Sequence, residues 1–204
     1  LQSLRPQQWV KNAFVLAPLV FSANLTDAQA VVRALLATVA FCLLSGAVYL
    51  INDIFDVEKD RAHPTKCNRP IAAGRISLAH ARLAAGLILL VALGGGFALD
   101  WRLGVVALIY FGQNFLYSWK IKHVVFLDVT SIALGFLLRT IGGAFAIDVA
   151  FSSWLFGCTF LLALYLGLGK RKHEMLQAGA GRGKQRRVLE KYNVETLNYA
   201  LLLC

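Results

Sequence analysis

The stretch NDIFDVEKD, which begins at Asn52, spaces three aspartates for one face of a helix. If the apolar helix before it continues, Asp53, Asp56 and Asp60 fall within an arc of about 60° at ~100° per residue, and Glu58 points away. Three carboxylates at the C-terminal end of a helix repel one another and the helix dipole, which favours a bound cation. Mg²⁺ takes few protein carboxylates and keeps substrate phosphates as ligands. We therefore predict Mg²⁺ as the cofactor, held by Asn52, Asp53, Asp56 and Asp60.

Basic side chains follow directly, in the stretch RAHPTKCNRP. Arg61, Lys66 and Arg69 can take the phosphate charge that a metal ion leaves unneutralised. Carboxylates for a metal and cations for phosphate together describe a diphosphate site. The structural alternative is a solvated helix end with surface ion pairs, which is common at membrane boundaries.

The elements that must position these groups are membrane-spanning helices. The chain is 58% apolar and only 16% charged, which is too apolar for an ordinary soluble domain. Its apolar stretches recur at membrane-spanning length, so we expect an all-α, polytopic transmembrane helical bundle. The first stretch is short for a full crossing, and a further apolar stretch starts at Tyr199. The predicted spans are 10–23, 31–51, 78–98, 103–119, 128–147 and 152–169.

The net charge of +10 is distributed asymmetrically over these spans. Only Arg33 and Arg102 fall on one side, Arg139 lies within a span, and the other Lys and Arg residues lie on the opposite side. The positive-inside rule places that side in the cytoplasm, which explains the charge without a nucleic-acid partner. We expect a multi-pass protein of the cell membrane with its active site on the cytoplasmic face. The glycine-rich, basic segment 177–187 is interpreted as a mobile cytoplasmic loop.

Together, NDIFDVEKD and the following HPTKCNRPIAAGRIS resemble the first aspartate-rich motif of the UbiA superfamily of membrane prenyltransferases, N-D-x-x-D-x-x-x-D with R-P a few residues on. The likeness continues in RPQQWVKN, YSWKIKH, GFLLRTIGGAFA and GKRKHE, and so covers essentially the whole chain. Within the superfamily these blocks look most like the decaprenyl-phosphate phosphoribosyltransferase branch. The main local reason is HPTK at His63–Lys66, where aromatic prenyltransferases tend to show an Arg-Thr pair.

The resemblance implies a nine-span fold, of which six to seven spans are present here. We expect a single UbiA-like integral membrane domain over residues 1–204. Because the chain starts at Leu1 without a methionine and stops within the apolar run YALLLC, we expect it to be truncated at both ends.

Residue roles also follow from the resemblance. Asn52, Asp53, Asp56 and Asp60 would bind Mg²⁺ and diphosphate, and the three aspartates would be catalytic together with two lysines. The family's second acidic motif is usually DxxxD, whereas this chain has basic residues and one glutamate there, which suits a substrate with an additional phosphate. The implied phosphate, substrate and second-motif positions are Lys66, Arg69, Tyr117, Lys122, Lys170, Arg171 and Glu174, with Lys122 and Lys170 as the catalytic lysines.

Arg139 lies about eleven residues into its predicted span, near mid-membrane at ~1.5 Å per residue. An arginine there needs a partner or a polar cavity. Asp128, Gly135, Arg139 and Gly142 share an arc of about 60° on that helix. Two interpretations stay open: a contact with a substrate phosphate or headgroup, or a structural contact with an ion-pair partner or a backbone carbonyl.

We expect the protein to transfer a 5-phosphoribosyl group from phosphoribosyl diphosphate to a polyprenyl (decaprenyl-type) phosphate, with release of diphosphate. The partners would then be these two substrates and membrane lipids. The alternative enzyme moves a polyprenyl chain from a prenyl diphosphate to an aromatic acceptor such as 4-hydroxybenzoate. A transporter or scaffold that uses the acidic cluster for ion passage is a third hypothesis, which predicts polar residues lining several spans.

Overall fold

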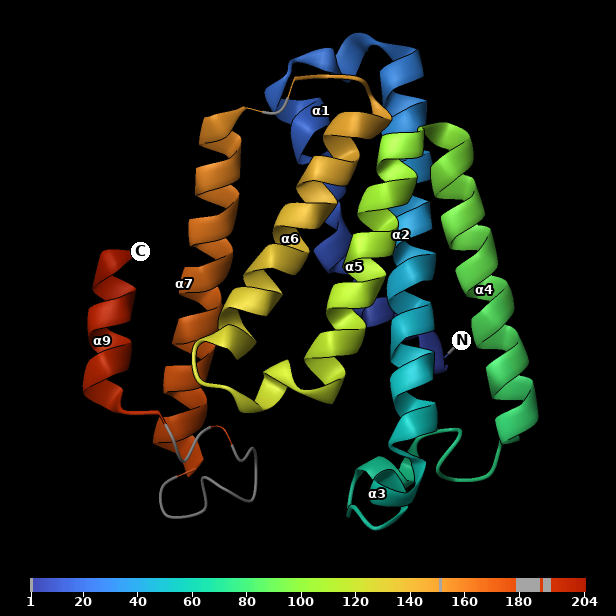
Figure 1. The fold of residues 1–204 in the computed structure, drawn as a ribbon, viewed down its shortest axis with the longest axis vertical. Helices are drawn as coiled ribbons and strands as arrows, with labels where there is room; N and C mark the ends of the chain where they lie inside the picture. Colours follow the sequence, from blue (N-terminus) through green and yellow to red (C-terminus); the bar gives the residue numbers. More distant parts are fainter. Residues whose placement is uncertain (1, 151, 179–187, 189–191) are drawn as a thin grey trace. The chain divides into compact units, whose positions relative to one another are not determined.

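Every regular element in the described part of the chain is a helix, which confirms the all-α prediction (Figure 1). The computed structural model describes residues 2–150, 152–178, 188 and 192–204. Most of the basic segment 177–187, predicted to be mobile, lies outside these residues. In chain order the elements are η1 (Gln2–Leu4), η2 (Pro6–Leu16), α1 (Ala17–Phe21), η3 (Asn24–Thr26), α2 (Ala28–Phe55), α3 (Val57–Arg61), η4 (Lys66–Asn68), α4 (Leu78–Leu99), α5 (Trp101–Trp119), η5 (Ile121–His123), α6 (Leu127–Ala146), α7 (Ser153–Ala178) and α9 (Val194–Leu203), where η denotes a 3₁₀ helix.

Among the described residues, four helices are long and apolar enough to cross a membrane: α2, α4, α6 and α7. Each matches a predicted span. Helix α5 also forms where a span was predicted, over 19 residues, but the polar pair Gln113-Asn114 interrupts its apolar run. The chain is thus a multi-pass membrane protein. The shorter apolar helix α9 begins at Val194, before the predicted start at Tyr199.

The predicted first span, 10–23, is not one continuous α-helix. It is made of the end of η2 followed by the short helix α1. Pro18 lies in the first turn of α1 and has no N–H to donate to the preceding turn, so the helical hydrogen-bond pattern is interrupted there. This segment packs against α2 instead of forming a long helix of its own.

The chain divides into two compact units, each described here by itself. The first contains Leu1–Phe111 and Arg139–Ala150, and the second contains Gly112–Leu138 and Phe151–Cys204. The predicted single domain over 1–204 stays a prediction.

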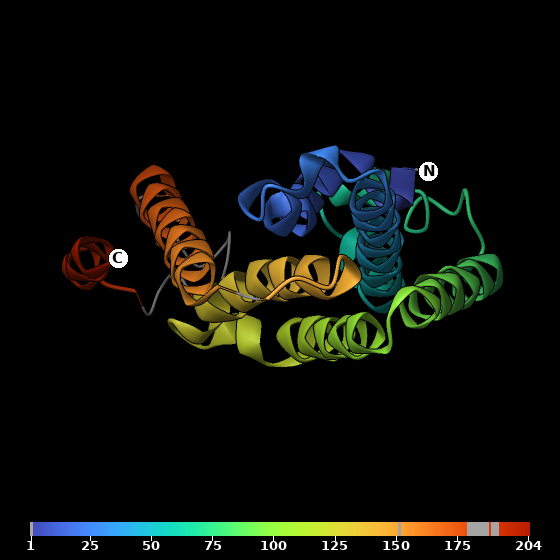
Figure 2. The same cartoon turned by 90° about the horizontal axis from the view of Figure 1, so that it is seen from above.

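Helices α2 and α4 form the best-packed pair of the first unit and lie side by side in both views (Figure 1, Figure 2). The buried residues of α4 are all small: Ala81, Ala85, Ala92 and Gly96. They lie on one face of the helix. Ala81 and Ala85 pack in one cluster with Leu50 of α2, whereas Gly96 lies beside Gly104 of α5. Small residues at such contacts let neighbouring backbones approach closely, as is usual between membrane helices. The side chains of Asp27 and Ser77 cap the N-termini of α2 and α4. This packing fixes the end of α2, where the acidic motif lies.

The C-terminal part of α6 packs against the rest of the first unit through two glycines. A Cβ atom on Gly142 would meet the Phe41 ring, and one on Gly143 would lie inside van der Waals contact with the backbone carbonyl of Val15. Arg33 closes the same end of the unit by donating to the carbonyls of Ala146 and Leu99. Both glycines are therefore required by close contact with neighbouring segments.

We expect Gly143→Ala to destabilise the protein by roughly 1–3 kcal/mol, because the methyl group has no room beside a backbone carbonyl. Gly94→Ala is the matched control, since a Cβ there meets nothing within 4 Å. Thermal unfolding of the detergent-purified protein measures both variants. Equal midpoints for Gly143→Ala and wild type would contradict the packing described here.

Candidate diphosphate and metal site

The acidic motif begins inside α2 and ends in α3. Helix α2 stops at Phe55, and Asp56 leaves the helical conformation with φ −95° and ψ 9°, while its N–H still donates to the Asn52 carbonyl. The predicted uninterrupted helix is therefore broken at Asp56. As a result Asp53 and Asp60 are both turned inward and are 3% exposed, whereas the Asp56 side chain is 35% exposed.

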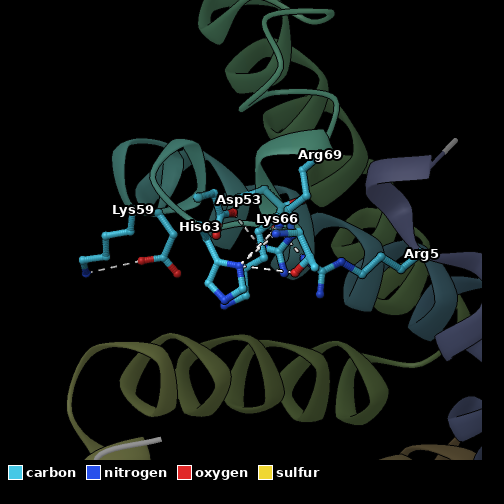
Figure 3. A network of polar contacts seen from close by, with 9 residues as sticks. Arg5, Asp53, Lys59, His63, Lys66 and Arg69 are labelled. Carbon is cyan, nitrogen blue, oxygen red and sulfur yellow. Dashed lines mark hydrogen bonds and ion pairs between the residues drawn. The ribbon is translucent and has the colours of Figure 1, made fainter. Parts of the chain in front are cut away.

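One arginine joins the two buried carboxylates. Nη1 of Arg69 donates to Oδ1 of Asp53 at 3.1 Å and to Oδ2 of Asp60 at 2.6 Å. Nη2 of Arg5 donates to the same Asp53 oxygen at 2.5 Å, and the Arg5 guanidinium lies over the Tyr49 ring. Figure 3 shows Arg5 and Arg69 approaching Asp53. Two of the three predicted carboxylates are thus brought together, with two cations to balance their charges.

The remaining residues of the motif lie at its exposed edge. Asp56 forms an ion pair with Lys59 at 3.5 Å. Exposed ion pairs of this kind contribute little to stability. The Glu58 side chain is 80% exposed and pairs with Arg61 at 3.1 Å, so its predicted orientation away from the other carboxylates is confirmed. Arg61 was predicted to contact phosphate, and in this structure it binds Glu58 and the carbonyl of Ala72.

The HPTK loop is shaped by the His63 ring. Its Nδ1 lies 3.3 Å from the backbone nitrogen of Thr65 and 3.4 Å from that of Lys66, and it accepts from both N–H groups (Figure 3). The Lys66 side chain is exposed and makes no hydrogen bond or ion pair with any described residue, which leaves its ammonium group available to a phosphate.

The oxygen ligands present suit a Mg²⁺ ion that is bound by only one or two carboxylates. No group of three or more His, Cys, Asp or Glu side chains converges among the described residues. Asp53 and Asp60 do converge on one arginine nitrogen. One or two carboxylates completed by water and substrate phosphates is the usual environment of Mg²⁺ in phosphate-handling sites. Asp53 and Asp60 therefore fit an ion that is shared with a diphosphate, while Asn52 and Asp56 are not brought into this pair.

The second motif has a buried ion-pair network within its own unit. Arg171 of α7 is 2% exposed, and it donates to Asp128 at 2.7 Å and to Glu174 at 2.8 Å. Asp128 is fully buried and also accepts from the Tyr192 hydroxyl at 2.5 Å. The Tyr192 hydroxyl accepts in turn from the backbone N–H of Phe126 at 2.9 Å. Burial, followed by the hydrogen bond to Asp128, raises the pKa of Tyr192, so the phenol stays protonated and can donate.

The other predicted positions of the second unit are less enclosed. Tyr117 is half-buried near the end of α5 and interacts electrostatically with Arg171. Lys122 lies in η5 and Lys170 is exposed on α7. Neither lysine makes a side-chain hydrogen bond or ion pair with the residues that the structure describes. Their predicted contacts with substrate phosphates stay predictions.

Arg139 lies in a buried polar network of the first unit. Its Nε donates to Oδ1 of Asn12 at 2.7 Å and its Nη2 to the Tyr110 hydroxyl at 2.6 Å, with the guanidinium over the Tyr110 ring. Asn12 is held by Cys42 and Ser45. At 6% exposure, and with an amide and a phenol among its partners, Arg139 fits the structural alternative.

Comparison with known proteins decides the family. Residues 13–170 match the UbiA prenyltransferase family. The chain belongs to the UbiA family. This agrees with the resemblance seen in NDIFDVEKD and in the blocks that follow it.

Two relatives of the UbiA chain carry the same name. The chain is 36% identical, over 100% of its length, to the decaprenyl-phosphate phosphoribosyltransferase of Mycolicibacterium smegmatis, of which it covers 65%. It is 35% identical, over 98% of its length, to the decaprenyl-phosphate phosphoribosyltransferase of Corynebacterium glutamicum, of which it covers 61%. The UbiA chain thus spans less than two thirds of the length of these curated relatives.

A solved structure confirms the UbiA fold. The UbiA homologue from Archaeoglobus fulgidus bound to DMAPP and Mg²⁺ superposes with a TM-score of 0.78 at 19% identity, over 98% of this chain and 71% of that one. At this identity the likeness shows the fold alone, and it agrees with the predicted UbiA-type helical bundle.

In the two ion-pair networks around Asp53 and around Arg171, the residues Arg5, Asp128 and Tyr192 were not predicted as site residues. Arg5 begins RPQQWVKN, and the available signal was an arginine at the same predicted membrane boundary as the carboxylates. Asp128 was placed on one helical stripe with Arg139, but its partners are Arg171 and Tyr192. Tyr192 follows a long polar segment, and we find no sequence signal that pairs it with Asp128.

We expect Tyr192→Phe to destabilise the UbiA chain by about 1–3 kcal/mol, because it removes the hydroxyl that donates to Oδ1 of the fully buried Asp128 and accepts from the Phe126 N–H. Tyr199→Phe on the neighbouring helix α9 is the control, since Tyr199 is 69% exposed. Thermal unfolding of both variants in the same detergent gives the comparison. If the two hydroxyl deletions cost the same, the Tyr192 hydroxyl does not stabilise this network.

Proposed function

We propose that the intact protein transfers the 5-phosphoribosyl group from phosphoribosyl diphosphate to a polyprenyl phosphate and releases diphosphate. The observation that carries this proposal is the pair of buried carboxylates, Asp53 and Asp60, held by Arg69 and Arg5 next to a loop whose lysine, Lys66, is exposed. Such a cluster provides oxygen ligands for a metal ion and cations for phosphate in one place. The two relatives named decaprenyl-phosphate phosphoribosyltransferase support the choice of donor and acceptor.

The reaction needs little covalent chemistry from the protein. The acceptor phosphate is already ionised at neutral pH, so one of its oxygens can attack the anomeric carbon without a general base. A new carbon–oxygen bond forms as the bond to diphosphate breaks, and the diphosphate leaves with the bonding electron pair. The protein therefore contributes mainly by orienting two phosphorylated substrates and by stabilising charge.

Each part of the cluster has a proposed role. Asp53 and Asp60 would hold Mg²⁺, which when bound supplies positive charge to the departing diphosphate. Arg5 and Arg69 pair with the two buried carboxylates and hold them in place. Lys66 would contact a substrate phosphate directly. Lys122, Lys170 and Arg171 are proposed phosphate contacts by family resemblance, and Arg171 is oriented by Asp128 and Glu174.

We place the reaction on the cytoplasmic side of the membrane. Lys and Arg residues gather at the predicted boundary that also carries Asp53 and Asp60, and such residues are retained on the cytoplasmic side of bilayers. A phosphorylated, water-soluble donor would reach the site from that compartment, while the acceptor would stay in the bilayer.

Prenyl transfer is the second candidate, because the family is named for it. It uses the same carboxylates with a prenyl diphosphate as donor and an aromatic ring, such as that of 4-hydroxybenzoate, as acceptor. The HPTK loop favours the first candidate, since its lysine has no side-chain partner among the described residues and can bind an additional phosphate that a prenyl diphosphate does not carry.

A two-substrate assay separates the candidates. We expect the intact protein to form labelled lipid from radiolabelled phosphoribosyl diphosphate and decaprenyl phosphate, in a reaction abolished by EDTA and restored by Mg²⁺. We expect no product from prenyl diphosphate and 4-hydroxybenzoate. Product only in the second reaction would replace our proposal with prenyl transfer.

Carboxylate variants test the site independently of the substrate pair. Asp60→Asn should lower kcat/KM on the order of 10²-fold, the usual effect of removing one preorganised electrostatic contact, and should raise the Mg²⁺ concentration required for half-maximal rate. Glu58→Gln is the matched control, because its side chain is exposed and pairs only with Arg61 among the described residues. Initial rates over a Mg²⁺ series measure both. Equal losses in the two variants would show that the inward-facing carboxylates have no special role.

A further inference from the structure

A groove of about 370 Å³ lies between the last turns of α2 and the first half of α4. Ile51, Ile54 and Phe55 line it from α2, and Gly86 and Leu89 line it from α4, with Arg82 as its charged member. All of them belong to the first unit. The groove is therefore apolar along its length and cationic at the end that is nearer the start of α4.

The groove faces away from the carboxylates. Ile51 and Phe55 each lie two residues from Asp53, which places them about 160° around the helix from it. The exposures agree with this, because Asp53 is 3% exposed and Phe55 is 70% exposed. A molecule in the groove would contact the outer face of α2, whereas Arg5 and Arg69 bind Asp53 on the other face.

Arg82 is the unusual member of this lining. Its side chain is exposed and makes no hydrogen bond or ion pair with any part of the chain that the structure describes. It lies one turn into α4, near the predicted membrane boundary, where an arginine can keep its stem against apolar surface and its guanidinium at headgroup level. A guanidinium binds phosphate through paired hydrogen bonds.

We propose that this groove binds an anionic phospholipid of the bilayer, with its phosphate on Arg82 and one acyl chain along Ile51, Ile54 and Leu89. An apolar wall in a membrane-spanning pair of helices is matched by an acyl chain, and the unpaired cation is matched by a headgroup with net negative charge. The polyprenyl phosphate acceptor is not the occupant, because its phosphate must reach the carboxylate side of α2.

Gly86 provides a direct way to block the groove. A Cβ atom there meets nothing within 4 Å, and Gly86 lines the groove, so a side chain added at this position occupies groove space. Gly94 on the same helix is equally open and is not part of the lining. Gly86→Leu and Gly94→Leu therefore make the same chemical change inside and outside the groove.

The test measures lipid binding to the intact, detergent-purified protein by native mass spectrometry, with phosphatidylglycerol and phosphatidylcholine as probes. We expect Arg82→Gln to weaken phosphatidylglycerol binding about five-fold, the effect of one basic residue at an anionic lipid surface. Gly86→Leu should weaken it about tenfold, because the leucine displaces at least two acyl methylene groups. Gly94→Leu and the charge control Arg75→Gln should bind within about twofold of wild type, the scatter expected of surface changes.

Several results would overturn the proposal. Equal affinity for phosphatidylglycerol and phosphatidylcholine would show that Arg82 does not select an anionic headgroup. Unchanged binding in both groove variants would show that the groove is not the lipid-binding site. Competition by decaprenyl phosphate, together with a raised acceptor KM in Gly86→Leu, would assign the groove to the acceptor instead. If Gly86→Leu does not purify as a folded protein, Arg82→Gln and the comparison of the two lipids decide the question.

Discussion

The bridge from Arg69 to Asp53 and Asp60 is the interaction on which the candidate site depends. Two carboxylates that are 3% exposed would be costly to keep ionised at the end of a membrane helix without paired cations. Arg5 and Arg69 supply two positive charges for these two negative ones, with three hydrogen bonds. Helix α2 ends at Phe55, and the turn at Asp56 leads into α3, from which Asp60 reaches Arg69. The buried pair therefore joins two short consecutive helices through one arginine.

The second unit balances its charges by a related arrangement with the signs reversed. Arg171 is the buried cation, and Asp128 and Glu174 are its carboxylate partners, with the Tyr192 hydroxyl completing the coordination of Asp128. This arrangement distinguishes the basic residues of the second motif by how freely each can move. Arg171 already has two anionic partners, so its guanidinium is held in one orientation, and a substrate phosphate would have to approach it there. Lys122 and Lys170, which have no side-chain partner among the described residues, are the more suitable phosphate ligands in this unit, because their flexible stems can adapt to a substrate.

Local regularities of the sequence were enough to predict the helices and part of the site. The long apolar runs predicted α2, α4, α6 and α7, and the helical period placed Glu58 away from Asp53. Interactions between distant residues were not predictable in this way. Arg5 lies 48 residues before its partner Asp53, and Tyr192 lies 64 residues after Asp128, and no periodic pattern connects such pairs. The predicted set of Asn52, Asp53, Asp56 and Asp60 was partly separated for a local reason, because a turn at one residue rotated Asp56 toward solvent.

The last turns of α2 show how one short segment can serve two environments. With about 3.6 residues per turn, a step of two residues nearly reverses the face that a side chain occupies. Asp53 therefore points toward Arg5 and Arg69, while Ile51 and Phe55 point toward the groove beside α4. The close packing of α2 against α4 holds α2 in this orientation and so keeps the two faces distinct. The phosphate chemistry and the bilayer contact are then separated by the thickness of a single helix, and a lipid bound in the groove would stabilise the same helix pair that positions the carboxylates.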